Sequence, residues 1–325
     1  MNPPLLSVRD LAVRYPVDTA AGRVWLQALG GVSFELAAGE CLGLVGESGS
    51  GKSTLARALL RLVPASGGSA WFRGADLLKL RGAKLRAIRE HLQMVFQDPQ
   101  SALDPRMTVG QIIGEPLREF RPGLDAHGRE QCVLAMMQRV GLLPVHLHRY
   151  PHEFSGGQAQ RIGIARALIL EPVLLLCDEP ISALDVSIKS QLSNLLKDLQ
   201  QQLKLAMLFI AHDLSAVRFS CDRVLVLYLG RVMELASRAS LYSAARHPYT
   251  QALLQAIPQA DPQRPGRLRP ALVGEAPSPL APPSGCVFRN RCPLAIPRCA
   301  AEVPELRKVS DNLVACHRAE ETGPA

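Results

Sequence analysis

The stretch Gly46-Glu-Ser-Gly-Ser-Gly51-Lys52-Ser53 decides how this chain folds, because it matches the pattern G-x-x-x-x-G-K-[ST]. The apolar run Cys41–Val45 precedes it, and a pattern that predicts a helix over Lys52–Val63, ended by Pro64, follows it. Between a strand and a helix, the glycines let backbone N–H groups turn toward phosphate oxygens, and the helix N-terminus adds positive potential. Lys52 should reach the β- and γ-phosphates, and the Ser53 hydroxyl should coordinate Mg²⁺. The predicted cofactor-binding residues of this loop are Gly46, Glu47, Ser48, Gly49, Ser50, Gly51, Lys52, Ser53 and Thr54.

The rest of the first 257 residues alternates short apolar runs with longer amphipathic stretches. One such stretch has apolar residues at helical spacing, namely Ile188, Leu192, Leu195 and Leu199. Alternating strands and helices indicate an α/β fold, here of the P-loop NTPase type, with a largely parallel sheet. The predicted buried strands outside the loop are His91–Phe96, Val173–Cys177, Ala206–Ala211 and Arg223–Leu229.

Two parts of the chain break this alternation. Strand signals vanish between Asp98 and Phe154, while Arg129–Val140 looks helical, which predicts a helical insertion. About half of the 25 prolines lie after residue 257, so the last fifth should be an irregular extension held by something other than a hydrophobic core. We therefore expect an α/β core over 1–97 and 155–257, a helical subdomain over 98–154 and a C-terminal extension over 258–325.

Composition excludes several classes of protein. The 325 residues are 47% hydrophobic and 20% charged, which excludes a disordered, fibrous or small disulfide-stapled chain. The longest apolar runs, Val173–Cys177 and Leu205–Ala211, are far shorter than the roughly 18 residues of a membrane span, and the N-terminus has no signal-peptide pattern, so the cytosol is the default compartment. The net charge of +8 would suit nucleic acid, an anionic membrane surface or ordinary solubility.

Two adjacent carboxylates follow a predicted buried strand. Asp178, at the end of the run Val173–Cys177, would be held where it can bind the shell of a Mg²⁺ ion. Glu179 would point at the γ-phosphate and orient or deprotonate the attacking water. An Asp-Glu pair is a weak signal by itself, and it gains weight here because the phosphate loop is already assigned.

A second anion-binding helix start lies at Ser155-Gly156-Gly157-Gln158. Ser155 makes a good N-cap for a helix over Ala159–Leu170, and the two glycines expose the backbone amides of that helix start. A chain that binds one nucleotide alone has no need of a second such site. The arrangement fits a nucleotide held by another subunit.

In this order and spacing, Phe154-Ser-Gly-Gly-Gln158 resembles the signature of ABC-type ATPases, and the remaining motifs of that family match as well. The resemblance implies a Q-loop glutamine that binds Mg²⁺, a D-loop, a switch histidine that contacts the γ-phosphate and an aromatic ring stacked on adenine. Those positions are Gln97, Ser182–Asp185, His212 and Tyr15, with Asp185 assigned to the nucleotide site.

The resemblance further implies that two such chains sandwich ATP and separate after hydrolysis. Ser155, Gly156, Gly157 and Gln158 would then act on the nucleotide of the partner subunit. Two positions depart from the family pattern: Phe154 replaces the usual Leu, and Ala159 stands where Arg or Lys is common. Neither removes a phosphate-facing group, so an active site is expected.

The end of the chain, from His247 onward, resembles the tail of dipeptide, oligopeptide and nickel importer ATPases, with the second ATPase subunit of dipeptide importers as the nearest likeness. The matching segments are His247–Leu254, Gly274–Leu280, Pro283–Pro293 and Ala315–Cys316. In that family two related ATPases pair beneath two membrane subunits, and a periplasmic or extracellular binding protein delivers the substrate. The resemblance therefore implies a peripheral subunit at the cytoplasmic face of the cell (inner) membrane.

Eight cysteines divide into two sets. Stable disulfides are disfavoured in the cytosol, and the tail set lacks the paired C-x₂-C spacing of structural zinc sites. The tail could hold a [4Fe–4S] cluster, which the family resemblance implies, or zinc, or unliganded thiols, and a bound group would be structural. The tail set is Cys286, Cys292, Cys299 and Cys316, and the core or incidental set is Cys41, Cys132, Cys177 and Cys221.

Together these features predict an ATP-hydrolysing subunit of an ABC importer for peptides or related small solutes. Its ligands would be ATP and Mg²⁺. The metal would be held by Ser53, Gln97 and Asp178, and the catalytic residues would be Glu179, His212 and Gln97. A soluble ABC ATPase acting on nucleic acid or ribosomes is a rival, although such proteins usually carry two ATPase cores or a long coiled coil. A regulatory subunit with structural ATP is another. Dipeptides, longer peptides, nickel chelates and opine-like solutes all stay open as substrates.

Overall fold

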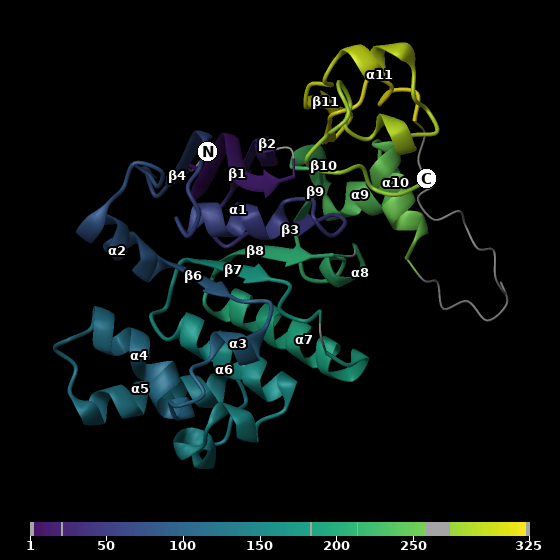
Figure 1. Cartoon of the computed structure of the whole chain (residues 1–325). Helices are drawn as coiled ribbons and strands as arrows, with labels where there is room; N and C mark the ends of the chain where they lie inside the picture. Colours follow the sequence, from purple (N-terminus) through teal and green to yellow (C-terminus); the bar gives the residue numbers. More distant parts are fainter. Residues whose placement is uncertain (1–2, 21, 183, 213, 258–273, 323–325) are drawn as a thin grey trace, which may run out of the picture. The chain divides into compact units, whose positions relative to one another are not determined.

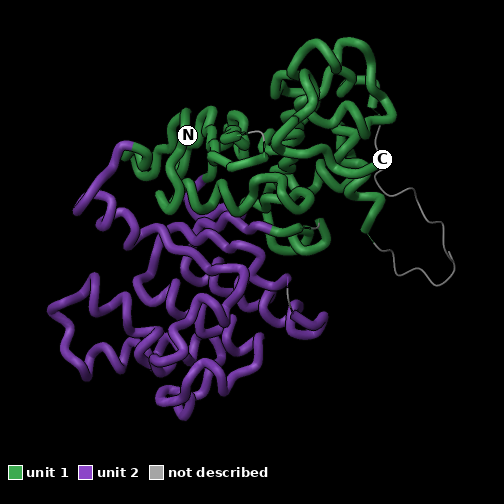
Figure 2. Tube along the Cα trace, viewed as in Figure 1, with its two compact units in different colours: residues 1–36, 42–78, 211–325 green, residues 37–41, 79–210 purple. Residues whose placement is uncertain are grey.

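The elements of the chain fall into two compact units. The computed structural model describes residues 3–20, 22–182, 184–212, 214–257 and 274–322. Unit 1 comprises 1–36, 42–78 and 211–325, and unit 2 comprises 37–41 and 79–210 (Figure 2). The predicted division into core, insertion and extension stays a prediction, and its boundary at residue 258 lies outside the described residues.

Unit 1 contains an antiparallel sheet that the sequence did not predict. Leu6 of β1 pairs with Leu36 on one side and with Phe72 on the other, and all three side chains are buried. The register of β1 shifts between Val8 and Leu11, which breaks the strict alternation by which a strand is recognised in sequence. The sheet has the order β2-β1-β4-β5, with bounds β1 (Leu6–Thr19), β2 (Gly22–Leu36), β4 (Gly67–Phe72) and β5 (Ala75–Asp76).

A second series of strands in unit 1 carries the phosphate loop. Every residue of β3 is buried, as expected for a strand covered on both faces. β3 pairs in parallel with β9, with Leu42 opposite Arg223 and Val45 opposite Val226, and β9 pairs antiparallel with β10. The order is β11-β12-β10-β9-β3, with bounds β3 (Cys41–Val45), β9 (Arg223–Tyr228), β10 (Arg231–Ser237), β11 (Arg307–Val309) and β12 (Asn312–Val314).

Helix α1 (Lys52–Leu59) is shorter than the predicted helix that ends at Pro64. Arg61 adopts a left-handed backbone with φ 58°. The N–H of Leu62 donates to the carbonyl of Arg57 and the N–H of Arg61 to that of Ala58, at 2.8 and 3.0 Å, which is a Schellman ending. The Arg61 side chain donates to the carbonyl of Leu77 at 2.9 Å. This cap, and not the proline, ends the helix.

The described part of the C-terminal extension, residues 274–322, is more regular than expected. β12 pairs with the edge of β10, and Val309, Val314 and Ala319 form a small buried cluster. The prediction of an irregular segment holds for most of these residues, which lie outside helices and strands, but packing also contributes, because β10 supplies a strand with which β12 pairs. The helices of unit 1 after β3 are α1, α8 (Leu214–Val217), α9 (Arg238–Ala244), α10 (Pro248–Gln255), η3 (Arg289–Arg291) and α11 (Pro297–Ala301).

Unit 2 has a parallel sheet flanked by helices, as predicted (Figure 1). β7 lies between β6 and β8, with Asp178 opposite Ile210 at the carboxyl end. The strands are β6 (Leu92–Val95), β7 (Leu174–Asp178) and β8 (Ala206–Ala211). The helices are α2 (Gly82–His91), α3 (Pro99–Ala102), α4 (Val109–Phe120), α5 (Ala126–Arg139), η1 (Pro144–His148), η2 (Pro151–Glu153), α6 (Gly156–Leu168) and α7 (Val186–Gln202).

The predicted helical stretch of unit 2 is confirmed. Residues 98–154 are all described, and they contain helices and no strand. α5 begins three residues before the predicted start because Asp125 caps it, accepting from the N–H of Gly128 at 2.7 Å. In α7 the buried residues are Leu192, Leu196 and Leu199, so the buried stripe is displaced from the predicted one.

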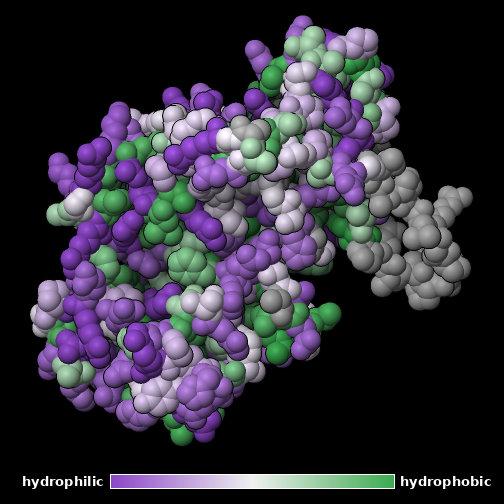
Figure 3. Space-filling model, in the orientation of Figure 1, coloured by the Kyte–Doolittle hydropathy of each residue, from purple (hydrophilic) through white to green (hydrophobic). Residues whose placement is uncertain are grey.

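The face shown in Figure 3 is largely hydrophilic, with hydrophobic residues in small patches. Within the described ranges, the helices are too short or too polar to cross a membrane. Several large apolar side chains are nevertheless exposed, among them Val186 at the start of α7, at 81%. Isolated exposed apolar side chains are common on protein surfaces, but Val186 adjoins the predicted site residue Asp185, which makes the start of α7 a candidate contact surface.

Candidate nucleotide site

The phosphate loop lies between β3 and α1, where the sequence places it. At Gly46, a Cβ atom would come within 2.1 Å of the Leu227 carbonyl oxygen. At Gly51, where φ is +102°, it would come within 2.5 Å of the Ala28 carbonyl oxygen. Both positions therefore require glycine, because neighbouring backbone from β2 and β9 packs against the loop.

Lys52 folds back over the loop that precedes it. Its ammonium group donates to the carbonyl oxygens of Gly46 and Glu47, at 2.7 and 2.9 Å, and lies 3.5 Å from the Ser50 hydroxyl. The residue is only 5% exposed. A buried ammonium ion needs such partners, so its position at the centre of the loop is fixed by the loop itself. This places one positive charge where an anion held by the loop amides would lie.

The loop is tied to the rest of unit 1 by contacts that sequence reasoning missed. The N–H of Gly230 donates to the Ser50 carbonyl at 2.8 Å. Tyr249 of α10 accepts from the N–H of Glu47 at 2.9 Å, and Arg291 of η3 forms an ion pair with the Glu47 carboxylate. Both residues lie in the two tail segments that resemble importer ATPases, but nothing in those segments pointed to the loop.

Asp178, Glu179 and Gln97 meet at the carboxyl end of the sheet in unit 2. Asp178 is the last residue of β7 and is buried. Glu179 has a left-handed backbone, with φ 45°, and its N–H donates to the Ile210 carbonyl at 3.1 Å. Gln97, two residues after β6, donates from Nε2 to Glu179 Oε2 at 3.2 Å. The left-handed backbone of Glu179 is uncommon for a residue other than glycine, and such residues are typical of functional sites.

Ser155 caps helix α6, as predicted. Its hydroxyl accepts from the N–H of Gln158 at 3.4 Å, while the Gln158 side chain accepts from the N–H of Ser155 at 3.1 Å. Phe154 is buried and meets the ring of His146 edge-on at 5.1 Å, which explains a larger residue at the usual Leu position. A Cβ atom on Gly157 would come within 2.7 Å of Ile188 Cγ2, so α7 packs on this glycine.

Three further predicted site residues lie outside the phosphate loop. Tyr15 is half-buried in β1, opposite Leu26. Asp185 is the N-cap of α7 and is exposed. His212 is exposed directly after β8. Their predicted roles stay predictions.

The four tail cysteines gather in one region of unit 1. The N–H of Cys286 donates to the carbonyl of Cys299 at 2.8 Å, and the thiols of Cys286, Cys292 and Cys299 lie near enough to Cys316 to add to the rise in its pKa. Burial raises the pKa of the Cys316 thiol to about 11. All four are free thiols. As arranged, however, no three His, Cys, Asp or Glu side chains in the described ranges form a group that could hold a metal ion.

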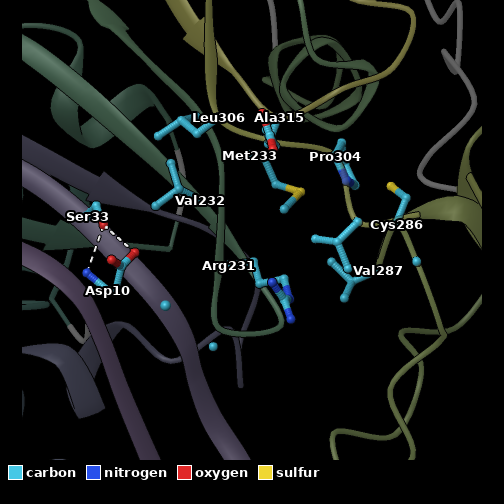
Figure 4. A pocket seen from close by; sticks show the side chains of 15 residues that line it. Asp10, Ser33, Arg231, Val232, Met233, Cys286, Val287, Pro304, Leu306 and Ala315 are labelled. Atoms are coloured by element: carbon cyan, nitrogen blue, oxygen red, sulfur yellow. Dashed lines mark hydrogen bonds between the residues drawn. The ribbon is translucent and has the colours of Figure 1, made fainter. Parts of the chain in front are cut away.

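A separate cavity of about 610 Å³ opens in unit 1 (Figure 4). Asp10 and Ser33, which are hydrogen-bonded to each other, line it together with Arg231, Cys286 and Glu305. No residue of the phosphate loop is among its lining residues. It is therefore not part of the nucleotide site.

Comparison with known proteins places the chain in a family. Residues 29–182 match the ABC transporter family, and residues 233–299 match the C-terminal region of oligopeptide/dipeptide transporters. The chain is 51% identical over 321 residues to the oligopeptide transport ATP-binding protein OppF of Salmonella typhimurium, covering 96% of this chain and 95% of that protein. It is 54% identical over 306 residues to a putative peptide import ATP-binding protein of Brucella ovis, covering 94% and 95%.

Solved structures agree with this result. The bacterial ABC transporter cassette MJ0796, solved as a dimer, has a TM-score of 0.65 and 27% identity, covering 72% of this chain and 98% of that one. The ABC transporter component cbiO1 of Clostridium perfringens has the same TM-score and identity, covering 74% and 91%. Relatives of about 50% identity span nearly the whole chain, so the chain belongs to the ABC transporter family, among the ATP-binding subunits of oligopeptide and dipeptide transporters.

Proposed function

We propose that this chain binds and hydrolyses ATP to power the import of di- or oligopeptides across the cytoplasmic membrane. The observation that carries the proposal is the phosphate loop in its strand–loop–helix setting, with the Lys52 ammonium held at its centre. The names of the relatives, oligopeptide transport and peptide import ATP-binding proteins, support peptides over other solutes.

In this proposal the residues of each unit have distinct tasks. Lys52 and the loop amides bind phosphates, and oxygen donors suited to Mg²⁺ come from Ser53, Gln97 and Asp178. Glu179 takes a proton from the attacking water, and the Gln97 amide bonded to it fixes its orientation. His212 contacts the γ-phosphate, and Tyr15 stacks on adenine. When bound, the metal neutralises charge on the phosphates.

A second, related ATPase subunit would complete the site. The exposed N-cap of α6 offers Ser155, Gly156, Gly157 and Gln158 to a nucleotide held by the partner. Asp185 is exposed at the start of α7, and the adjacent Val186 is 81% exposed, which suits a surface that another subunit covers. The dimeric cassette MJ0796 has the same fold.

Two membrane-spanning permease subunits and a periplasmic or extracellular binding protein would supply substrate recognition. Unit 2 has a cavity of about 310 Å³ between α4, α5 and η1, lined by Gly114, Val133 and Leu147 among others. A short cytoplasmic helix of a permease subunit would fit this mixed apolar and polar surface. The chain would then be a peripheral protein of the inner membrane, and its net charge of +8 would serve docking and solubility, not nucleic acid.

Peptide uptake tests this function directly. In cells that lack other peptide importers, a transporter that contains the wild-type chain should take up peptides. With Glu179→Gln in this chain, peptide uptake should fall to the level of cells that lack the transporter. A panel of dipeptides, longer peptides, a nickel chelate and an opine-like solute identifies the substrate class. Uptake of a nickel chelate or opine alone would contradict import of peptides, and undiminished peptide uptake by the variant would contradict ATP-driven import by this chain.

We propose separately that Cys286, Cys292, Cys299 and Cys316 are ligands of a structural [4Fe–4S] cluster. In support, all four are free, and the other three thiols lie near enough to Cys316 to contribute to its raised pKa. Against it, they do not form a metal-binding group as arranged in the described residues, so binding requires the side chains to reorient. No step of ATP hydrolysis depends on this group.

Metal content decides between cluster, zinc and free thiols. Protein purified without oxygen should contain about four iron and four sulfide per chain, with broad absorbance near ~400 nm. Cys292→Ser should lose the iron, whereas Cys132→Ser, which changes an exposed cysteine of unit 2, should keep it. Stoichiometric zinc, or the absence of any metal under these conditions, would overturn the proposal.

A further inference from the structure

The C-terminal extension holds the phosphate loop through one ion pair. Arg291 donates from Nη1 to Glu47 Oε2 at 2.6 Å and from Nη2 to Glu47 Oε1 at 3.1 Å. The contact is bidentate, which is the strongest and most directional form of such a pair. The Arg291 side chain is 6% exposed and that of Glu47 29%, so solvent screens the pair only weakly.

A cluster of buried aromatic rings fixes the arginine in place. Nη1 of Arg291 also donates to the Tyr228 hydroxyl at 3.3 Å, and its guanidinium lies 5.9 Å from the centre of the Tyr228 ring. The rings of Tyr228, Tyr249 and Phe288 lie within 5.4 Å of one another, centre to centre, and all three residues are buried. Phe288 belongs to the extension and Tyr228 to β9, so packing holds the extension against the strand beside the loop.

The backbone of the loop is held by the same cluster. The Tyr249 hydroxyl accepts from the N–H of Glu47 at 2.9 Å. Burial raises the pKa of Tyr249 well above its usual value, so the hydroxyl stays neutral. This amide therefore faces the tyrosine and not a phosphate, and both the backbone and the side chain of Glu47 are anchored to groups outside the loop.

The charge of Glu47 gives this contact a consequence for nucleotide binding. Glu47 is the only acidic residue between Gly46 and Thr54. A free carboxylate there would repel the negative charges of a triphosphate held by the same loop. The guanidinium of Arg291 compensates that charge, and its hydrogen bonds to the carboxylate raise the pKa of Arg291 above its ordinary value, so the arginine stays charged.

We propose that Arg291 of the C-terminal extension and Tyr249 of α10 are positioning residues for the phosphate loop, and that the extension sets nucleotide affinity through Arg291. The proposal rests on the proposed binding of ATP by the loop at residues 46–54. Glu47 is then the anchor between loop and extension and makes no phosphate contact of its own. Nothing in the transport reaction requires the extension to touch the loop, so this is a further role for it.

A double-mutant cycle on Glu47 and Arg291 tests the proposal in the full-length chain. Arg291→Met should weaken binding of a fluorescent ATP analogue about tenfold, because it leaves an uncompensated carboxylate in the loop. Glu47→Gln, which keeps one acceptor for the guanidinium, should weaken affinity by about threefold, and combining it with Arg291→Met should cost clearly less than the two single losses together, because the double variant has no unpaired charge. Arg291→Lys, which keeps the charge but not the bidentate geometry, should fall between. The effect should appear in KM for ATP, with kcat of the assembled transporter nearly unchanged.

Matched variants separate positioning from unfolding. Arg307→Met removes an ion pair with Glu320 that lies wholly within the extension, so it should lower the melting temperature without changing affinity. Tyr249→Phe should weaken binding a few-fold, since it removes only the acceptor for the Glu47 N–H. Additive effects of Arg291→Met and Glu47→Gln would overturn the proposal, as would equal losses in Arg291→Met and Arg307→Met. Failure of the wild-type chain to bind ATP would instead refute the proposed function.

Discussion

Glu179→Gln should abolish turnover and leave ATP binding intact. Phosphate release by the assembled transporter should fall by a factor on the order of 10³, because a general base contributes about 10²–10⁴ to the rate. The substitution preserves shape, and the amide oxygen of glutamine still accepts from Gln97 Nε2, which lies 3.2 Å from the carboxylate oxygen it replaces. Affinity for ATP should therefore change by less than about threefold, since the loop that binds phosphate is untouched.

A second readout follows from the proposed sandwich. If hydrolysis separates the two subunits, the variant should remain associated with its partner in ATP, as measured by size-exclusion chromatography. Glu171→Gln is a suitable control, because Glu171 is exposed in the same unit and pairs only loosely with Arg139, at 3.5 Å. Wild-type turnover in Glu179→Gln would remove Glu179 from the mechanism and shift attention to another base.

The sequence predicted those parts of the site in which each residue's chemistry is set by its immediate neighbours. The phosphate loop is one, because the spacing of its glycines, Lys52 and Ser53 is a local pattern. The close approach of backbone at Ala28 and Leu227, which makes glycine necessary at two of these positions, is seen only in the structure. The cap formed by Ser155 and Gln158 is another, because both partners lie within four residues.

Contacts between distant segments were not predictable in the same way. Arg291 lies 244 residues after its partner Glu47, and an arginine in a segment rich in arginine gives no sign of what it contacts. The antiparallel sheet was missed because bulges in β1 interrupt the alternation of buried and exposed residues. The end of α1 was misplaced because a Schellman ending with arginine at the left-handed position lacks the usual glycine.

The packing of the extension was not predicted for the same reason, because its partners lie in distant segments of the chain. A long hydrophobic pattern was absent, and from that we expected a segment stabilised by something other than packing. The described residues instead use packing partners from elsewhere: β10 supplies an edge for β12, and the rings of Tyr228 and Tyr249 cover Phe288. A bound cluster, if iron is found, would add to this packing.

Lys52→Met should weaken ATP binding strongly with little loss of stability, and the difference between the two effects should be larger than for the other substitutions. Binding of ATP should weaken by at least about 100-fold, or roughly 2.7 kcal/mol, because the charge aimed at the phosphates is lost. The melting temperature should not fall by a comparable amount. Lys52 is 5% exposed, and burying its ammonium group costs free energy that its hydrogen bonds to loop groups, among them the carbonyls of Gly46 and Glu47, offset.

Methionine has a similar volume and suits the apolar stem of the lysine, so the loop should keep its glycine-dependent turns while losing its charge. Arg57→Met on the exposed side of α1 is the matched control, since it removes one positive charge from the same helix away from the loop. Titration with a fluorescent ATP analogue and a thermal melt of each variant give both quantities. If Lys52→Met bound ATP as tightly as Arg57→Met, the ammonium group would serve only to close the loop over its own carbonyls, and phosphate binding would have to come from the backbone amides alone.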